Sequence, residues 1–302
     1  MNISVDVGGS HIDIATVNED FKINLIYSID IDSNFRFDDF IYILFDIFGK
    51  RGLFVIDKLG FALPGTVDPY RNYCINCPNL KYWKSLDFNY FYQKFRDKGI
   101  YIKRIVVSND CNAGAVGAYK VLRLKEKNIV YIAVGTGIGA GAIINGRLLI
   151  GSNFSAMEVG HTKIDRKSYK CGCGAFSCIE TFASAKALTN YYNQFYKTTH
   201  KNLLSVIEKE NVFRVKRLFK RFSKYFSTLI SNVIYFIDPD FIFLSGKIVL
   251  SSEIFESFLF NDVISKVTMI EGYDLSRIVF LKEVKNYNTY NLIGAVWADE
   301  FI

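Results

Sequence analysis

Two glycine-centred turns, one near the start of each half, constrain the fold of this 302-residue chain more than any other feature. The first turn, Gly8-Gly9-Ser10, follows the apolar segment ISVDV, and the second, Gly135-Thr136-Gly137, follows IVYIAV. A second apolar segment follows each turn, so both predict β-hairpins. An alignment of the two turns also pairs Ala15 with Ala142 and Asn18 with Asn145. The pattern favours a duplicated architecture.

Helical and strand patterns alternate through the rest of the chain. Apolar periodicity predicts helices at 37–48, 112–124, 179–196, 213–236 and 291–301, and short apolar runs predict strands at 59–63, 105–108, 241–244 and 278–281. This alternation is typical of the α/β class. No low-complexity linker separates the halves. We therefore expect two lobes with a cleft between them, a small lobe of 1–119 plus 289–302 and a large lobe of 120–288.

Composition narrows the class of protein. Half of the residues are apolar and 22% are charged, which favours a folded globular chain. The net charge of +7 suits anionic nucleotides and sugar phosphates, and we expect the basic face of the 213–236 helix to be solvated rather than to bind nucleic acid. No signal peptide and no uncharged apolar segment of about 18 residues is visible. We expect a cytoplasmic protein without a membrane partner.

The glycine turns are candidate phosphate sites. The backbone N–H groups of Gly8-Gly9-Ser10 can approach phosphate oxygens closely because no bulky side chain intervenes. Asp6, at the end of the preceding strand, can hold Mg²⁺ directly or through water. Gly135-Thr136-Gly137 would form a second phosphate site, with the threonine hydroxyl as an additional donor. Plain hairpins are the alternative interpretation, and no P-loop motif occurs.

The segment SNDCN contains a candidate catalytic acid. The predicted strand 105–108 delivers Asn109 and Asp110 to a strand-to-helix junction, where ligand clefts open in α/β folds. Asp110 could accept a proton from a substrate hydroxyl, and Asn109 could fix the substrate. The alternative is that Asp110 only caps the following helix.

A histidine and three cysteines have the spacing of a zinc site. His161, Cys171, Cys173 and Cys178 would complete a closed tetrahedral set, which is typical of structural zinc. Three cysteines within eight residues favour a metal over a disulfide framework. We call residues 161–178 the zinc knob. Glu158 and Glu180 flank the knob, and they could bind sugar hydroxyls or could be surface residues without a function.

For three other features we expect no functional site. Cys74 and Cys77 have no partner ligands nearby in the sequence, so we do not expect a metal site there. His11 and His200 are isolated histidines, for which we expect surface or packing roles.

Together these motifs resemble the ROK family (repressors, uncharacterised reading frames and kinases) of the actin-like ATPase superfamily. The resemblance covers nearly the whole chain, and its most specific part combines EVGH with CGCGAFSCIE. The other matching segments are DVGGS, ALPGTVDP, PNLKYW, SNDCNAGAVGAY, GTGIGAGAIINGRL and IDPDFIFLSG. Three positions depart from the family pattern: His11, Met157 and the turn Ser245-Gly246-Lys247.

The resemblance implies a two-lobed actin-like ATPase (ribonuclease H-like) fold and a sugar kinase that uses Mg-ATP and contains structural zinc. Asp110 would be the general base. The implied sugar-binding residues are Gly65, Asn109, Asp110, Glu158, His161 and Glu180. The implied nucleotide-binding residues are Asp6, Gly8, Gly9, Ser10, Gly135, Thr136, Gly137 and Gly246. The resemblance also implies that the protein forms a homodimer or a homotetramer.

Glucose is the expected substrate, and N-acetylmannosamine, N-acetylglucosamine and fructose are the alternatives. A family repressor would carry a helix-turn-helix domain ahead of the first hairpin, and because the hairpin begins at Ile3 we expect none. A sugar sensor that has lost activity and a zinc-finger nucleic-acid binder are the remaining alternatives.

Overall fold

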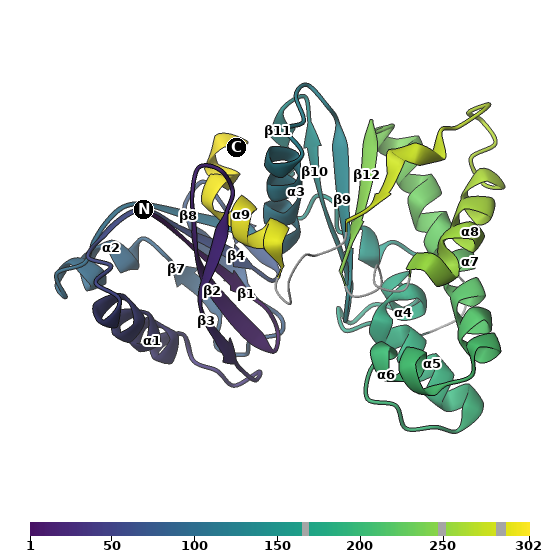
Figure 1. The fold of residues 1–302 in the computed structure, drawn as a ribbon, viewed down its shortest axis with the longest axis horizontal. Helices are drawn as coiled ribbons and strands as arrows, with labels where there is room; N and C mark the ends of the chain where they lie inside the picture. Colours follow the sequence, from purple (N-terminus) through teal and green to yellow (C-terminus); the bar gives the residue numbers. More distant parts are fainter. Residues whose placement is uncertain (165–168, 247–251, 282–287) are drawn as a thin grey trace. The chain divides into compact units, whose positions relative to one another are not determined.

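The computed structural model describes residues 1–164, 169–246, 252–281 and 288–302 (Figure 1). The chain forms two compact units. The first contains Met1–Lys127, Gly141–Ala156 and Glu283–Ile302, and the second contains Asn128–Ala140 and Met157–Lys282. Residues 120–127 and 141–156 group with the first unit, whereas the sequence prediction placed 120–288 in a single lobe.

A five-stranded sheet of order β3-β2-β1-β4-β8 forms the first unit's centre. Its strands are β1 (Asn2–Val7), β2 (His11–Val17), β3 (Ile23–Asp30), β4 (Val55–Leu63) and β8 (Tyr101–Asn109). β1 pairs antiparallel with β2, which confirms the first predicted hairpin, and parallel with β4, which in turn pairs parallel with β8. Because parallel strands end at the same sheet edge, Asp6 and the residues that follow β8 come to one edge.

Aromatic side chains hold two helices against one face of this sheet. The helices are α1 (Phe37–Lys50) and α2 (Tyr90–Arg96). The ring centroid of Phe61 on β4 lies 6.3 Å from that of Phe40 and 5.3 Å from that of Phe91. Large buried rings of this kind contribute much of the apolar surface that folding removes from water. A smaller three-stranded sheet joins β5 (Thr66–Asp68), β6 (Tyr73–Asn76) and β7 (Lys84–Asp87).

Two glycine-rich contacts join α3 (Asp110–Val121) to α9 (Thr289–Trp297), which lie side by side in Figure 1. A Cβ atom on Gly117 would lie 1.9 Å from the Tyr290 carbonyl oxygen, and one on Gly294 would lie 1.7 Å from the Ala113 carbonyl oxygen. The two helix backbones therefore touch where neither residue has a side chain. α9 continues into a 3₁₀ turn at Ala298–Glu300. This packing ties residues near position 290 to the helix that begins at Asp110.

The second sheet has the order β11-β10-β9-β12-β13, and the division between the units falls within β10. Its strands are β9 (Ile129–Val134), β10 (Ile138–Ile144), β11 (Arg147–Leu148), β12 (Phe241–Ser245) and β13 (Ile278–Phe280). The second predicted hairpin is therefore also present. β12 pairs parallel with both β9 and β13.

The helices of the second unit differ from the prediction in two respects: the helices at 203–209 and 252–264 were not predicted, and the one predicted at 179–196 is divided. They are α4 (Glu180–Ala183), α5 (Ala185–Tyr196), α6 (Leu203–Lys209), α7 (Val212–Ile237) and α8 (Ser252–Ile264), with 3₁₀ turns at Val159–His161 and Leu275–Arg277. The single helix predicted at 179–196 is wrong, because the backbone of Ser184 is extended and its hydroxyl accepts a hydrogen bond from the Ala187 N–H. Ser184 thus starts a new helix instead of continuing the first.

Helix α7 confirms the long amphipathic helix predicted at 213–236. Most of its apolar residues are buried, and its basic residues lie on the solvent side. The exceptions are near the helix ends, where Val212, Phe213 and Phe236 are exposed. Several arginines there stack on aromatic rings of α5; the Arg221 guanidinium carbon lies 4.1 Å from the Tyr191 ring centroid. Within the described residues, the helices fall short of the length and apolarity that a membrane crossing needs.

Candidate functional site

Asp110 is the first residue of α3, directly after the end of β8. The helix cap is Asn109, whose side-chain oxygen accepts hydrogen bonds from the N–H groups of Cys111 and Asn112 at 2.9 and 3.1 Å. The alternative in which Asp110 is the N-cap is therefore wrong. Asp110 also accepts from the Cys111 N–H, at 2.8 Å. An acid in this first turn is stabilised by the helix dipole.

Gly65 lies beside Asn109 because β4 and β8 pair in register, Leu63 opposite Asn109. The Asn109 side-chain nitrogen donates to the Gly65 carbonyl oxygen at 3.0 Å. Gly65 has a φ of +99°, and a Cβ there would lie 2.3 Å from the Asn76 carbonyl oxygen. Only glycine fits this position, both for its backbone angle and for its surroundings. The structure therefore brings three predicted sugar-site residues of the first unit together: Gly65, Asn109 and Asp110.

Asp6 is almost fully buried at the end of β1. Two asparagines donate to its carboxylate, Asn288 at 2.8 Å and Asn291 at 3.3 Å. Burial raises the pKa of Asp6 to about 7; the asparagine hydrogen bonds oppose this shift, and the nearby charges of Asp110 and Asp13 add to it. The partners that the described residues give Asp6 are thus neutral amides, which suits a carboxylate that can take a divalent cation.

The first glycine turn is closed by a hydrogen bond from the Gly8 N–H to the His11 carbonyl oxygen, at 2.8 Å. Gly9 and Ser10 lie exposed at its tip. A Cβ on Gly9 would lie 3.4 Å from Asn79, an ordinary contact. Three predicted phosphate-binding residues, Gly8, Gly9 and Ser10, therefore form a tight and accessible turn.

The second glycine turn is shorter, with a 3.0 Å hydrogen bond from the Gly135 N–H to the Gly137 carbonyl oxygen. A Cβ on Gly137 would lie 2.4 Å from a carboxylate oxygen of Glu180, and that oxygen accepts from the Ile138 N–H at 2.9 Å. Gly137 therefore makes room for Glu180. A Cβ on Gly135 would meet no atom within 4 Å.

Gly246 follows β12 with a φ of +91°, and a Cβ there would lie 2.6 Å from the Val134 carbonyl oxygen. This position also requires glycine. Lys247, the remainder of that turn in the sequence, lies outside the described residues.

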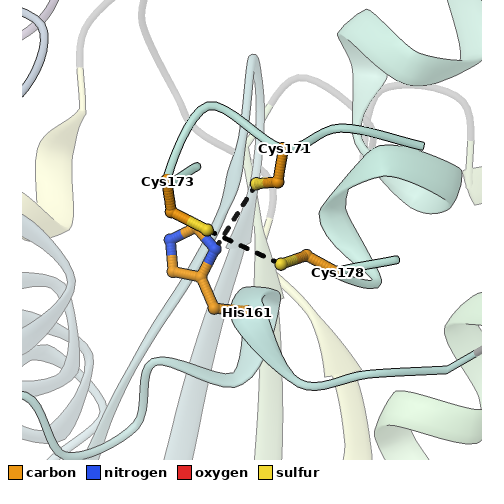
Figure 2. Close-up of side chains that lie close together, drawn as sticks. All are labelled: His161, Cys171, Cys173 and Cys178. Atoms are coloured by element: carbon orange, nitrogen blue, oxygen red, sulfur yellow. Dashed lines mark hydrogen bonds between the residues drawn. The ribbon is translucent and has the colours of Figure 1, made fainter. Parts of the chain in front are cut away.

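His161, Cys171, Cys173 and Cys178 point toward one another in Figure 2. Their ligand atoms all lie within 4.8 Å of each other; the Cys171 sulfur is 3.7 Å from His161 Nδ1, and the Cys173 and Cys178 sulfurs are 3.7 Å apart. Ligand atoms around tetrahedral zinc lie roughly 3.5 to 3.8 Å apart, given zinc–sulfur and zinc–nitrogen distances of about 2.3 and 2.0 Å. The four residues therefore fit a zinc ion.

The zinc-ligand set has charged and polar neighbours that sequence analysis did not identify. Lys163 donates to the Cys178 sulfur at 2.8 Å, and this hydrogen bond raises the pKa of Lys163. Burial raises the pKa of Cys171 to about 12, whereas the Ala175 N–H lowers that of Cys173. Zinc deprotonates the thiols that it coordinates, so Lys163 would offset part of the resulting negative charge.

Two glutamates lie against the same set. The other ring nitrogen of His161, Nε2, is 3.8 Å from a Glu158 carboxylate oxygen. The Cys171 sulfur is 3.6 Å from the second carboxylate oxygen of Glu180. Partial burial raises the pKa of Glu158; His161 opposes this and Glu180 adds to it. The zinc-ligand set, Glu158 and Glu180 thus form one connected group in the second unit.

Some partners could not be found from sequence. Asn288 and Asn291 are separated from Asp6 by more than 280 positions, and nothing in the segment around them marks them as its partners. Elsewhere, the buried sulfurs of Cys74 and Cys77 lie 2.9 Å apart, and hydrogen bonding between them raises the pKa of Cys77. Within the part of the chain that the structure describes, one group of three or more side chains could hold a metal ion, and it is the set that contains His161.

Comparison with known proteins identifies the relatives. The chain is 28% identical over 211 residues to a xylose repressor from Bacillus spizizenii, covering 69% of this chain and 53% of the repressor. It therefore spans about half the length of that relative. It is 25% identical over 275 residues to a glucokinase from Thermotoga maritima, covering 83% of each chain.

Among solved structures, the chain is similar to a ROK family glucokinase from Streptomyces griseus in complex with glucose and AMPPNP. The TM-score is 0.77 at 20% identity, over 98% of this chain and 97% of the other. This similarity confirms the predicted α/β fold of the ROK sugar kinases, an actin-like ATPase fold. Residues 2–297 match the ROK family as a whole. The chain belongs to the ROK family.

Proposed function

We propose that this chain is an ATP-dependent sugar kinase that transfers the γ-phosphate of Mg-ATP to a hexose hydroxyl, with the 6-hydroxyl of glucose as the first choice. The observation that carries the proposal is the sheet edge of the first unit. Asp110 lies there at the start of α3, beside Asn109 and Gly65 and within electrostatic reach of the buried Asp6. A base next to a cation-binding carboxylate is the arrangement that phosphoryl transfer to a hydroxyl needs.

In this proposal Asp110 accepts the proton of the attacking hydroxyl, which makes the oxygen a better nucleophile. Asn109 uses its side-chain oxygen and one N–H to hold the start of α3 and the Gly65 carbonyl. An amide nitrogen has two N–H groups. We assign the second N–H of Asn109 to the sugar, together with backbone contacts from Gly65.

The second unit would supply further sugar ligands. Glu158, His161 and Glu180 are assigned to sugar hydroxyls, because carboxylates accept two hydrogen bonds from a diol and an imidazole whose Nδ1 faces a metal keeps Nε2–H as a donor. The zinc would be structural. Its role is to fix the segment that connects these three side chains.

The glycine turns are assigned to ATP, with Gly8, Gly9 and Ser10 in the first unit and Gly135, Thr136 and Gly137 in the second. Gly246 would lie next to the adenosine. Asp6 would hold the magnesium ion, directly or through water, and the ion would offset the negative charge of the phosphates. A cytoplasmic homodimer or homotetramer remains the expected form.

N-acetylmannosamine, N-acetylglucosamine and fructose are the alternative substrates. The second candidate function is a sugar-responsive regulator, and the similarity to xylose repressors favours it. A regulator of this kind would bind sugar without transferring phosphate.

The test is release of ADP from ATP across glucose, the two N-acetylhexosamines, fructose and xylose. We expect turnover with glucose, and we expect Asp110→Asn to lower kcat by roughly 10² to 10⁴ while glucose still binds. Asp97→Asn, an exposed acid at the end of α2, is the matched control and should keep the wild-type rate. Sugar binding without ADP release from any sugar would contradict the kinase assignment and favour the regulator. Wild-type kcat in folded Asp110→Asn would reject Asp110 as the base.

A further inference from the structure

His11, the first residue of β2, lies against the first glycine turn. Its ring Cε1 would lie 3.5 Å from a Cβ placed on Gly8, and its Nδ1 is 3.3 Å from the Ser10 hydroxyl oxygen. About a third of the side chain is exposed, 36%. The imidazole is therefore part of the rim of the turn and is accessible to a ligand there.

Asp13 lies behind His11 on the same face of β2, two residues along the strand. Only 2% of Asp13 is exposed. One carboxylate oxygen accepts a 2.6 Å hydrogen bond from the Ser28 hydroxyl on β3. The other oxygen is buried without a hydrogen-bond partner among the described residues, and His11 Nε2 is 3.8 Å from it.

A buried carboxylate oxygen without a donor is unfavourable, because it loses its hydration and gains nothing in return. Protonated His11 would supply both the missing positive charge and, after a small movement, an N–H donor. The exposed ring edge toward Ser10 would remain directed to solvent. The Asp13 carboxylate therefore lies where a protonated His11 ring could pair with it.

The charged residues that the described strands place beside His11 and Asp13 are acidic. Asp30 on β3 is opposite His11 in the strand register, and Asp6 on β1 is opposite Asp13. From α9 and the residue before it, Asn291 and Asn288 contribute neutral amides to Asp6. When no magnesium ion is bound at Asp6, these carboxylates would repel a polyphosphate at the turn.

We propose that His11, held by Asp13, is a cationic phosphate-binding residue of the first glycine turn and contacts the polyphosphate of the nucleotide together with Ser10. This assignment rests on the proposed function only in naming ATP as the source of the phosphate. It gives Asp13 a positioning role. It also explains why a carboxylate oxygen is buried there without another partner.

The experiment titrates wild-type protein, His11→Gln, His11→Lys and Asp13→Asn with AMPPNP by calorimetry, without Mg²⁺, at about pH 6 and about pH 8, a range in which histidine can change charge. Wild-type protein should bind AMPPNP more tightly at the lower pH. His11→Gln should bind about tenfold more weakly there, the value of one charge-assisted hydrogen bond. Asp6 can also change charge in this range, but it does so in both proteins, so the difference between the two curves isolates His11.

His11→Lys keeps a cation at the turn, and it should restore affinity and remove the part of the pH dependence that His11→Gln removes. Adenosine, which has no phosphate, should bind all four proteins equally. Asp13→Asn should lose AMPPNP affinity toward the level of His11→Gln while its thermal stability stays equal or rises, because a buried charge is removed. A purely structural role would instead lower stability and leave the AMPPNP-to-adenosine difference unchanged.

Equal AMPPNP affinity of wild-type protein and His11→Gln at both pH values would overturn the assignment. Asp13→Asn with wild-type affinity would overturn the role of Asp13. The experiments distinguish failure of the kinase proposal from failure of the His11 proposal. A chain that phosphorylates no sugar but binds AMPPNP through His11 rejects the kinase and supports His11, whereas an active kinase indifferent to His11→Gln rejects only this inference.

Discussion

The two glycine hairpins obtain their carboxylates by different routes. The first carries Asp6 on its own strand, two residues before Gly8. In the second hairpin the aligned position is Ala133, and the carboxylate comes from Glu180 of α4, whose oxygen accepts from the Ile138 N–H. Asp6 is therefore held by a strand of its own hairpin. Glu180 is held by a helix that lies more than forty residues after the second hairpin in the sequence.

This difference determines what each hairpin depends on. Asp6 is buried, and its hydrogen-bond partners come from α9 and the residue before it. Glu180 follows Cys178 by two residues, so its position depends on the zinc-ligand set. The first hairpin should therefore be sensitive to pH through Asp6, and the second to zinc.

Loss of zinc should have the largest effect, and only on the second hairpin. Structural zinc can contribute on the order of 10 kcal/mol to local folding. Wild-type protein should contain one zinc per chain by elemental analysis, and Cys173→Ser should lose it. Hydrogen exchange at the Ile138 N–H should then accelerate, and sugar affinity should fall, while the Gly8 N–H, bonded to His11, stays protected.

The matched control is Lys170→Ser, an exposed position on the same loop that supplies no ligand. Wild-type protein without metal, and with all three thiols free to react, would reject the zinc site. Loss of protection at Gly8 but not at Ile138 would reject the contrast between the hairpins.

Asp6→Asn should change stability with pH. The folded-state pKa of Asp6 is raised by burial from 3.8 to about 7, so the folded protein favours the protonated acid. Wild-type stability should therefore decrease as pH rises from about 4 to about 7, by at most roughly 4 kcal/mol. Asp6→Asn should remove this decrease, and chemical denaturation across that range measures it.

Asp57→Asn is the control for this prediction. Its pKa is lowered to about 2 by hydrogen bonds from Lys103 and the N-terminal amine, so its effect should have the opposite sign and be small, because Asp57 is on the surface. An unchanged pH profile in Asp6→Asn would show that the carboxylate is not held as described.

Two alanine substitutions in the second turn give a finer test. Gly137→Ala would place a methyl group 2.4 Å from a Glu180 oxygen, whereas Gly135→Ala meets no atom within 4 Å. A displacement of about 1 Å can cost about a hundredfold in rate. We expect Gly137→Ala to lower kcat/KM for the sugar by about that factor. Gly135→Ala should leave sugar binding intact, and equal effects of the two substitutions on sugar kinetics would contradict the contact.

The elements that sequence predicted well are those with local signals. Both hairpins were predicted from glycine turns between apolar segments, and the ligand set at His161 was predicted from residue type and spacing. Helix α7 follows from its apolar periodicity. In each case neighbouring residues carry the information.

The missed features depend on distant contacts. The break at Ser184 was hidden because serine is tolerated within helices, and only tertiary packing selects its capping conformation. Asp110 was considered as a cap, but Asn109 has the extended backbone that a cap needs. His11 was expected to have a bland role, because the buried oxygen of Asp13 cannot be recognised before the register of β1, β2 and β3 is known.

The contact between Asp6 and Asn288 also has a consequence for synthesis on the ribosome. The partners are 282 residues apart, and at about 5 to 20 residues per second the second emerges roughly 15 to 60 seconds after the first. During that interval β1 and β2 can pair, but the sheet face that later receives α9 stays uncovered and Asp6 lacks its amide partners. The unit that contains β1 is therefore completed after the second unit, whose residues end at Lys282, and its apolar sheet face stays exposed during that interval.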